Sequence, residues 1–296
     1  MSEERDDLPL LDEVREIKTP GPDRDDTSVI LKEKRRLSDP LADDEAKKRM
    51  RTYSRRGFLV GGAAALLGVF GWRWMPEETK EKLLRRTFEF NERVSQVFYR
   101  PSRLAPEFPP ESISPPRVNG GEGMSGEFDP AKWTLSVGGL AGRTADLVLT
   151  LDDIRALPRT EMTTELKCIE GWTVIVNWAG VRFSDFAAAY SPQTQSGAPA
   201  DIAVRPHDLL PYVSLVTPDN AYYVGWDIQS ALHPQTLLAY EMNGAPLRPE
   251  HGAPLRLASP TKYGIKQIKR IGRIDFTAER PRDFWAESGY DWYSGH

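Results

Sequence analysis

The sequence predicts an α+β protein, a strand-rich domain preceded by a disordered tail and one hydrophobic helix. Three observations lead to this prediction. The first fifty or so residues are strongly charged, residues 58–75 form an apolar run, and short strand-like segments separated by turn signals follow residue 130. Many short strands with a few short helices are typical of the α+β class. With 40% hydrophobic and 28% charged residues, a chain of 296 residues can bury a core of ordinary size.

Residues 1–53 are rich in Asp, Glu, Lys, Arg and Pro and poor in aromatic residues. Such a segment cannot bury enough apolar surface to offset the entropy of the chain. We therefore expect a disordered tail. Its last residues are basic, which favours a cytoplasmic location for the tail if the next segment enters a membrane.

Residues 54–75 have the layout of an export signal. The pair Arg55-Arg56 is followed by Phe58, Leu59 and an apolar stretch, and this resembles a twin-arginine signal. An ordinary uncleaved Sec anchor is the alternative. From Phe58 to Met75 the run is just long enough to span a bilayer. We expect a retained anchor helix that places the rest of the chain on the periplasmic side.

Residues 76–116 are expected to form a helix, from residue 77 to about 99, and then a proline-rich extended linker. The catalytic domain is expected over residues 117–280, with residues 281–296 as a C-terminal extension. Its expected elements are a strand at 133–140, a strand end at 147–149 with a Thr/Asp-capped short helix that stops before Pro158, and strands at 162–168, 173–176, 202–204, 212–217, 237–242, 255–259 and 265–276. Asn243-Gly244 is a hairpin turn signal.

The charge and the cysteine count exclude some functions. A formal net charge of −4 without a basic stripe argues against nucleic-acid binding. The chain has one cysteine, Cys168, so it has neither an internal disulfide nor a zinc-type cysteine pair. In an exported protein a lone thiol is a liability unless it is buried or bound to a metal. By itself, burial as a small hydrophobic residue is the commoner fate.

The segment Cys168-Ile-Glu170-Gly-Trp172, followed by Trp178-Ala-Gly-Val, resembles the sulfite-oxidase family of molybdopterin enzymes. It is most similar to the bacterial branch that includes the catalytic subunit of the periplasmic protein-methionine-sulfoxide reductase. The resemblance implies a molybdenum–molybdopterin cofactor with Cys168 as the metal ligand. A thiolate is the soft ligand that such a metal accepts.

Glu170 stands two residues after the cysteine and would share its face if the chain were extended there. It is then a candidate proton donor or hydrogen-bonding group beside the metal. A buried carboxylate that pairs with Arg182 or a backbone N–H is the equal alternative.

A second block, His251-Gly-Ala-Pro-Leu-Arg256 and then Tyr263-Gly-Ile-Lys266-Gln-Ile-Lys269, is also similar to this family. The resemblance implies that His251, Arg256, Lys266 and Lys269 contact the cofactor, whose phosphate needs such donors. A solvated basic strand end is the alternative. The resemblance also implies that Asn119 and His207 contact the cofactor. The Gly-Glu-Gly that comes just after Asn119 departs from the family pattern, and His207 follows an expected strand.

The resemblance implies oxygen-atom transfer, with reduction of sulfoxides as the leading substrate class. Sulfite oxidation is the second candidate reaction. It would need a cationic pocket, and Arg182, Arg205 and Arg256 are the residues that could form one. The chain has no haem or iron–sulfur cysteine motif, so electrons are expected from a separate partner, for instance a membrane haem protein. With only about twenty residues after Phe276, we expect a single catalytic domain without the immunoglobulin-like dimerisation domain of vertebrate relatives, and hence a monomer.

Two hypotheses from other classes stay open on the sequence. Cys168 could be the nucleophile of a thiol enzyme with His207 or His251 as its base. Alternatively, the chain could be a membrane-anchored binding module on a domain that has lost its metal.

Overall fold

The computed structural model describes residues 10–11, 35–36, 71–124 and 128–296. Almost all of the predicted tail and most of the predicted anchor, residues 54–75, therefore lie outside the described residues. Within the described part, no helix has the length and apolar character needed to cross a membrane. The chain divides into two units, residues 1–77 and 78–296. In the first unit, β1 (Leu10–Leu11) pairs with β2 (Arg35–Arg36).

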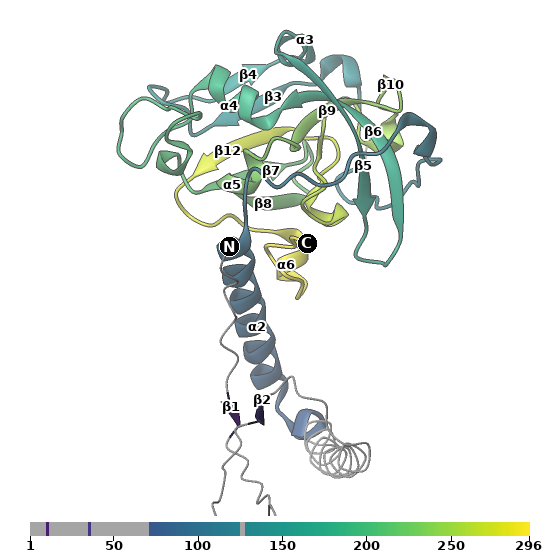
Figure 1. Ribbon diagram of the computed structural model, residues 1–296. Helices are drawn as coiled ribbons and strands as arrows, with labels where there is room; N and C mark the ends of the chain where they lie inside the picture. The colour runs from purple at the N-terminus through teal and green to yellow at the C-terminus, as the bar shows by residue number, and fades with distance from the viewer. Residues whose placement is uncertain (1–9, 12–34, 37–70, 125–127) are drawn as a thin grey trace, which may run out of the picture. The chain divides into compact units, whose positions relative to one another are not determined.

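The helix predicted from residue 77 is confirmed as α2 (Glu77–Phe98). An ion pair one turn apart supports it, since Arg85 Nη2 lies 2.7 Å from Glu81 Oε1. Glu92, the buried residue of this helix, accepts a hydrogen bond of 2.6 Å from Arg280 near the C-terminus. This contact joins the end of α2 to the strand-rich domain (Figure 1).

One sheet carries the sequence motifs. Its order is β10-β9-β6-β5, with β11 paired to β9, and all of its pairs are antiparallel. The strands are β5 (Arg159–Lys167), β6 (Thr173–Arg182), β9 (Leu237–Met242), β10 (Ala245–Pro246) and β11 (Arg256–Ala258). The first block therefore lies at the turn between β5 and β6 and in β6 (Figure 1), and the second block reaches the same sheet through Arg256 in β11.

The second sheet has the order β4-β3-β12-β7-β8. Strands β3 and β12 run parallel, and the other neighbours are antiparallel. The strands are β3 (Leu135–Gly138), β4 (Leu147–Leu149), β7 (Tyr212–Val216), β8 (Tyr223–Asp227) and β12 (Arg273–Thr277). The sequence analysis did not predict β8.

Four short helices complete the domain: α3 (Leu151–Arg155), α4 (Phe183–Tyr190), α5 (Ile228–Ala231) and α6 (Phe284–Glu287). The predicted cap of α3 is confirmed, because Thr150 and Asp153 satisfy each other's backbone N–H groups in a capping box. Single 3₁₀ turns lie at Pro110–Ser112, Pro130–Lys132, Pro206–Asp208, Pro249–His251 and Gly264–Lys266. The mixed, strand-rich α+β class predicted from the sequence is thus confirmed.

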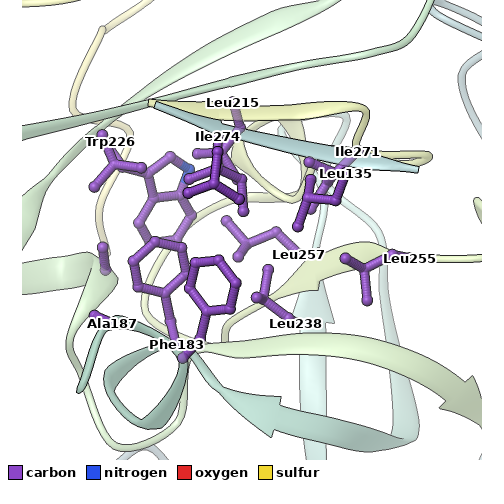
Figure 2. Close-up of a cluster of buried hydrophobic side chains, with 14 of the residues drawn as sticks. Leu135, Phe183, Ala187, Leu215, Trp226, Leu238, Leu255, Leu257, Ile271 and Ile274 are labelled. Carbon is purple, nitrogen blue, oxygen red and sulfur yellow. The ribbon is translucent and has the colours of Figure 1, made fainter. Parts of the chain in front are cut away.

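The main core contains residues from both sheets and from α4 (Figure 2). Leu215 and Ile274 come from the second sheet, Leu238 and Leu257 from the first, and Phe183 from α4. All five side chains are at most 1% exposed. Their burial fixes the two sheets against each other, since removal of apolar surface from water is the main favourable term in folding.

Two predicted strands are wrong. Residues 202–204 form turns, because Asp201 accepts hydrogen bonds from Val204 N through its side chain and from Arg205 N through its carbonyl. The segment predicted as one strand over residues 265–276 begins as a 3₁₀ turn, and only its end forms β12. By contrast, the hairpin turn at Asn243-Gly244 is confirmed, with φ values of 52° and 75° that fit a type I′ turn.

Candidate active site

Cys168 follows the last residue of β5 and begins the turn between β5 and β6. The turn closes with hydrogen bonds from Cys168 N to Trp172 O (2.9 Å) and from Gly171 N to Cys168 O (3.1 Å). Gly171 has a φ of +84°, a left-handed conformation that glycine adopts without strain. The Cys168 residue is 8% exposed, so the hairpin holds its thiol in a mostly buried position.

The thiol faces a cavity of about 340 Å³, which we call the metal-side cavity. Its walls come from the segment after the proline-rich linker, from the β5–β6 hairpin, from the 251–269 block and from the C-terminal extension. The lining residues used below are Arg117, Asn119, Cys168, Glu170, Trp172, Trp178, Tyr222, Met242, His251, Arg256, Gln267, Lys269, Trp285 and Tyr290. Six of the eight predicted site residues are therefore in one cavity.

The proline-rich segment brings Asn119 to the thiol. It lies along the first sheet, with hydrogen bonds from Phe108 N to Thr163 O (2.9 Å) and from Ser114 N to Ile175 O (3.0 Å). The Asn119 side-chain amide then donates to Cys168 Sγ at 3.6 Å. This contact orients the sulfur toward the cavity that both residues line.

Lys269 ties three segments of the site together. Its ammonium donates to the carbonyls of Asn119, Gly120 and Glu250, the last two at 3.3 and 3.0 Å. Burial, reinforced by the neighbouring Arg256, lowers the pKa of Lys269 to about 8. The side chain is thus still mostly protonated at neutral pH.

Arg256 is held in the same way. Its guanidinium donates to His251 O (3.0 Å) and Gln267 O (3.1 Å) and lies 4.7 Å from the ring centroid of Trp178. Burial lowers its pKa to about 10. Among the described residues, neither Arg256 nor Lys269 has a carboxylate within salt-bridge distance. Backbone carbonyls accept their hydrogen bonds instead. The two positive charges are therefore not neutralised, and they favour an anionic ligand.

His251 completes this wall as a neutral group. It is 2% exposed, and its Nε2 lies 3.2 Å from Arg248 Nη2. Burial and the charge of Arg256 lower the pKa of His251. A neutral imidazole beside two cations can accept one hydrogen bond and donate another.

Glu170 is exposed, and its carboxylate accepts a hydrogen bond of 2.8 Å from Trp172 Nε1. The alternative of a buried carboxylate paired with Arg182 is therefore wrong. The chain turns after Cys168, so the extended geometry assumed from the sequence is not formed. Arg117 lies over the Trp172 ring at 4.7 Å, and these three side chains together form part of the cavity wall.

The structure places two predicted site residues away from this cavity. Lys266 is buried behind its wall, where its ammonium lies 2.5 Å from Asp283 Oδ2 and donates to Gly225 O at 2.8 Å. His207 is an exposed residue of the turn Pro206–Asp208. The three-residue spacing of Lys266 and Lys269 suggested a common ligand, but the 3₁₀ turn at Gly264–Lys266 directs their side chains to different sides.

Sequence reasoning missed three of the five aromatic residues that line the cavity. Tyr222 comes from the loop before β8, and Trp285 and Tyr290 come from the C-terminal extension. Trp285 and Tyr290 contact each other edge to face, with centroids 5.2 Å apart. No local pattern marks these residues, because their neighbours in space are remote in sequence.

The donor set fits a molybdopterin. The cavity offers one sulfur ligand, an amide donor at that sulfur, and two cations, the buried Arg256 and the half-buried Lys269, with a neutral histidine for a phosphate. In the described part of the chain, no group of three or more His, Cys, Asp or Glu side chains could hold a metal ion. This donor set corresponds to a metal that is bound by one protein thiolate and by a sulfur-bearing organic ligand.

The site and fold thus define a molybdopterin-dependent oxidoreductase, and comparison with known proteins agrees. The model of the oxidoreductase molybdopterin-binding domain matches residues 122–285, more than half of the chain. The chain belongs to this family. It is therefore a molybdenum-dependent oxidoreductase with a molybdenum–molybdopterin cofactor.

Several relatives carry more specific names. The chain is 32% identical over 248 residues to a protein of Azospira oryzae that is provisionally named protein-methionine-sulfoxide reductase subunit YedZ1, with coverage of 83% of this chain and 87% of that one. It is 31% identical to the protein-methionine-sulfoxide reductase catalytic subunit MsrP of Campylobacter jejuni, over 58% of this chain and 59% of the relative. The corresponding Xanthomonas axonopodis protein is 33% identical over 55% and 51%. The chain thus spans between half and three-fifths of the length of these two MsrP proteins.

Among solved structures, the sulfane dehydrogenase SoxCD of Paracoccus pantotrophus overlaps 52% of this chain and 40% of its own, with a TM-score of 0.42 and 21% identity. This overlap is too loose to support a functional comparison.

Proposed function

We propose that this enzyme reduces sulfoxides, in particular methionine sulfoxide in proteins, at a molybdenum centre bound by Cys168. The observation that carries the proposal is the single buried thiol in a cavity that also holds Asn119, Arg256 and Lys269. The names of the relatives support the substrate class. When bound, the cofactor supplies exchange of an oxygen atom coupled to a change of metal oxidation state.

The residues of the chain have separate tasks in this proposal. Cys168 supplies the ligand, and the Asn119 amide orients and stabilises its thiolate. Arg256 and Lys269 hold the phosphate end of the pterin by charge, and His251 adds a hydrogen bond. Arg256 and Lys269 are already positioned by hydrogen bonds to backbone carbonyls, so little ordering of these two side chains is needed on binding.

Glu170 is placed to handle protons at the cavity. Loss of a sulfoxide oxygen as water consumes two protons, and the exposed carboxylate can exchange protons with solvent. The hydrogen bond from Trp172 fixes one of its oxygens. Both residues line the same cavity as the thiol.

The lining favours a sulfoxide over sulfite. Of the three arginines considered for a sulfite pocket, only Arg256 lines the cavity, while Arg182 ends β6 and Arg205 is bound to Pro199 O. Arg117 also lines the cavity and lies over the ring of Trp172, and five aromatic side chains, Trp285 and Tyr290 among them, are part of the wall. Aromatic rings suit the methyl and methylene groups that flank the sulfur of a methionine sulfoxide side chain and offer little to a small dianion.

The thiol-enzyme alternative receives no support from the geometry. Within the described residues Cys168 has no hydrogen bond to His207 or His251, and its polar partner is Asn119. A nucleophilic cysteine needs a base within hydrogen-bonding reach.

Export and electron supply are parts of the same proposal. The twin-arginine-like segment and the apolar run that follows it would anchor the enzyme with its catalytic domain in the periplasm. Electrons would come from a separate donor, because the sequence has no haem or iron–sulfur cysteine motif.

The test is a substrate comparison with the purified holoenzyme. Reduced methyl viologen would serve as electron donor for methionine sulfoxide, free or in an oxidised protein, and ferricyanide would serve as acceptor for sulfite. We expect viologen oxidation with the sulfoxides and no turnover with sulfite. Sulfite oxidation without sulfoxide reduction would overturn the proposed substrate class.

A further inference from the structure

The helix α2 leaves a row of apolar residues exposed. Leu83, Phe90, Val94 and Val97 follow one another at intervals of seven, four and three residues, which places them on one face of the helix. We call these four residues the outer stripe. Each of them is between 38% and 67% exposed. A helix on the surface of a globular protein normally turns such a stripe toward the core, so the arrangement in α2 is reversed.

The opposite face of α2 meets the domain. Glu92 lies two residues from two members of the outer stripe, about half a helical turn, and it accepts the hydrogen bond from Arg280. Tyr99, seven residues after Glu92, donates a hydrogen bond of 2.9 Å to Gln229 O. The domain is therefore held on the face opposite the outer stripe, and the stripe is open to another partner.

The charges of α2 are sorted around the outer stripe. Arg86 and Arg93 are each three or four residues from two members of the stripe, so these cations are its neighbours on the helix surface. None of the five glutamates of α2 has this spacing from a member of the stripe. Glu81, for example, pairs with Arg85 at 2.7 Å. The charged residues that border the stripe are therefore cations.

An apolar stripe bordered by cations matches the surface of an anionic lipid bilayer. In such a surface, apolar side chains enter the boundary between headgroups and acyl chains, and Lys and Arg bind the lipid phosphates. A second copy of α2 fits less well, because paired helices need opposite charges at the borders of their contact. The predicted anchor ends at Met75, two residues before α2 begins, so a retained anchor would bring the start of α2 to a membrane.

We propose that α2 binds the surface of an anionic phospholipid bilayer along the whole outer stripe, with Arg86 and Arg93 at the lipid phosphates. The domain lies on the other side of the helix, where Glu92 and Tyr99 hold it. This contact is separate from the predicted anchor. It also goes beyond the proposed function, since it does not depend on the reaction that the enzyme catalyses.

The test measures whether α2 reaches the acyl chains when the full-length holoenzyme is reconstituted in vesicles of phosphatidylcholine and phosphatidylglycerol. An environment-sensitive fluorophore is attached at Leu83→Cys or Val97→Cys, one at each end of the outer stripe. Glu81→Cys is the matched control, because it is exposed and lies two residues from Leu83, about half a helical turn. Wild-type protein treated in the same way reports any label on Cys168. The quencher is a lipid with a nitroxide on its acyl chain.

We expect the labels at Leu83 and Val97 to be quenched at least about twofold more strongly than the label at Glu81. Quenching at Leu83 alone would show that α2 stands away from the bilayer, and it would overturn the inference. Protection of both labels from aqueous acrylamide without quenching by the lipid would also overturn it, because the stripe would then be covered by protein.

Two further outcomes separate the inference from the proposed anchor. Vesicle-bound protein in which neither label is quenched would contradict the inference and leave the anchor standing. Protein that does not associate with the vesicles would contradict both. Sulfoxide reduction is not part of the readout, so a failure of the proposed substrate class would leave this test unaffected.

The role of charge is tested with Arg93→Glu in the protein labelled at Val97. A larger share of phosphatidylglycerol should increase quenching in the parent protein and leave it unchanged in Arg93→Glu. Arg143→Glu is the matched control, because it makes the same charge change at an exposed position outside α2, and it should keep the increase. Equal responses of the three proteins would overturn the assignment of an anionic lipid.

Discussion

At the scale of single residues, two buried histidines are held in their neutral form. His233 is 1% exposed, accepts a hydrogen bond at Nδ1 from Gln235 N and has its Nε2 3.4 Å from Arg103 O. His251 is 2% exposed and lies beside Arg248 and Arg256. Burial lowers the pKa of both imidazoles. Protonation is therefore easier in the unfolded chain than in the folded protein.

This difference makes stability depend on pH. Below about pH 6.5, the ordinary pKa of histidine, the unfolded chain takes up protons that the folded protein does not. The free energy of unfolding should then fall as the pH falls, until the lowered folded-state pKa is reached. We expect His233→Gln to reduce this slope by about 1 kcal/mol per pH unit between pH 6.5 and 5.5, measured by urea denaturation. An identical slope in variant and wild type would show that His233 is not buried as a neutral group.

Gly252 controls how closely the 251–269 block packs. It has a φ of +99°, and an added Cβ would lie 2.7 Å from Lys269 Cβ. Gly252→Ala should therefore cost about 1–2 kcal/mol for the backbone and about 1–3 kcal/mol more for the clash. Gly142→Ala is the matched control, because it has a φ of +68° and no atom near the added Cβ. Urea denaturation of both variants should show a larger loss for Gly252→Ala, and equal losses would exclude the close approach.

At the scale of elements, a buried ion pair attaches the C-terminal extension to the domain. Lys266 and Asp283 are 1% and 2% exposed at their side chains and 2.5 Å apart. Asp283 also accepts from Gly225 N and from Ala286 N at the start of α6. The extension in turn contributes Trp285 and Tyr290 to the metal-side cavity. The pair therefore connects the stability of the fold to the shape of the site.

Removal of one partner should be costly. Lys266→Met would leave a buried carboxylate without its cation, and we expect a loss of about 3–5 kcal/mol in the free energy of unfolding. Lys266→Met combined with Asp283→Asn should cost clearly less than the sum of the two single changes, since the charge is removed together with its partner. Chemical denaturation of the four proteins gives this coupling, and strict additivity would contradict a direct interaction.

At the scale of the whole molecule, local patterns predicted the α+β class, α2, the cap of α3 and the hairpin at Asn243-Gly244. These features depend on residues that are close in sequence. Cys168, His251, Arg256 and Lys269 were found through two motif blocks that the first sheet brings together. The sequence could not predict that Lys266 pairs with Asp283 or that Trp285 and Tyr290 line the cavity. These contacts arise from long-range packing of the C-terminal extension, which has no periodic pattern.

The central claim is that the Cys168 thiolate is the protein ligand of molybdenum. X-ray absorption spectroscopy at the molybdenum edge, with elemental analysis of the same samples, tests it most directly in the wild type and in Cys168→Ser. We expect the wild type to contain molybdenum. Its molybdenum should have one more sulfur neighbour than any molybdenum that Cys168→Ser retains. An identical number of sulfur neighbours in the two proteins, at equal metal content, would contradict it.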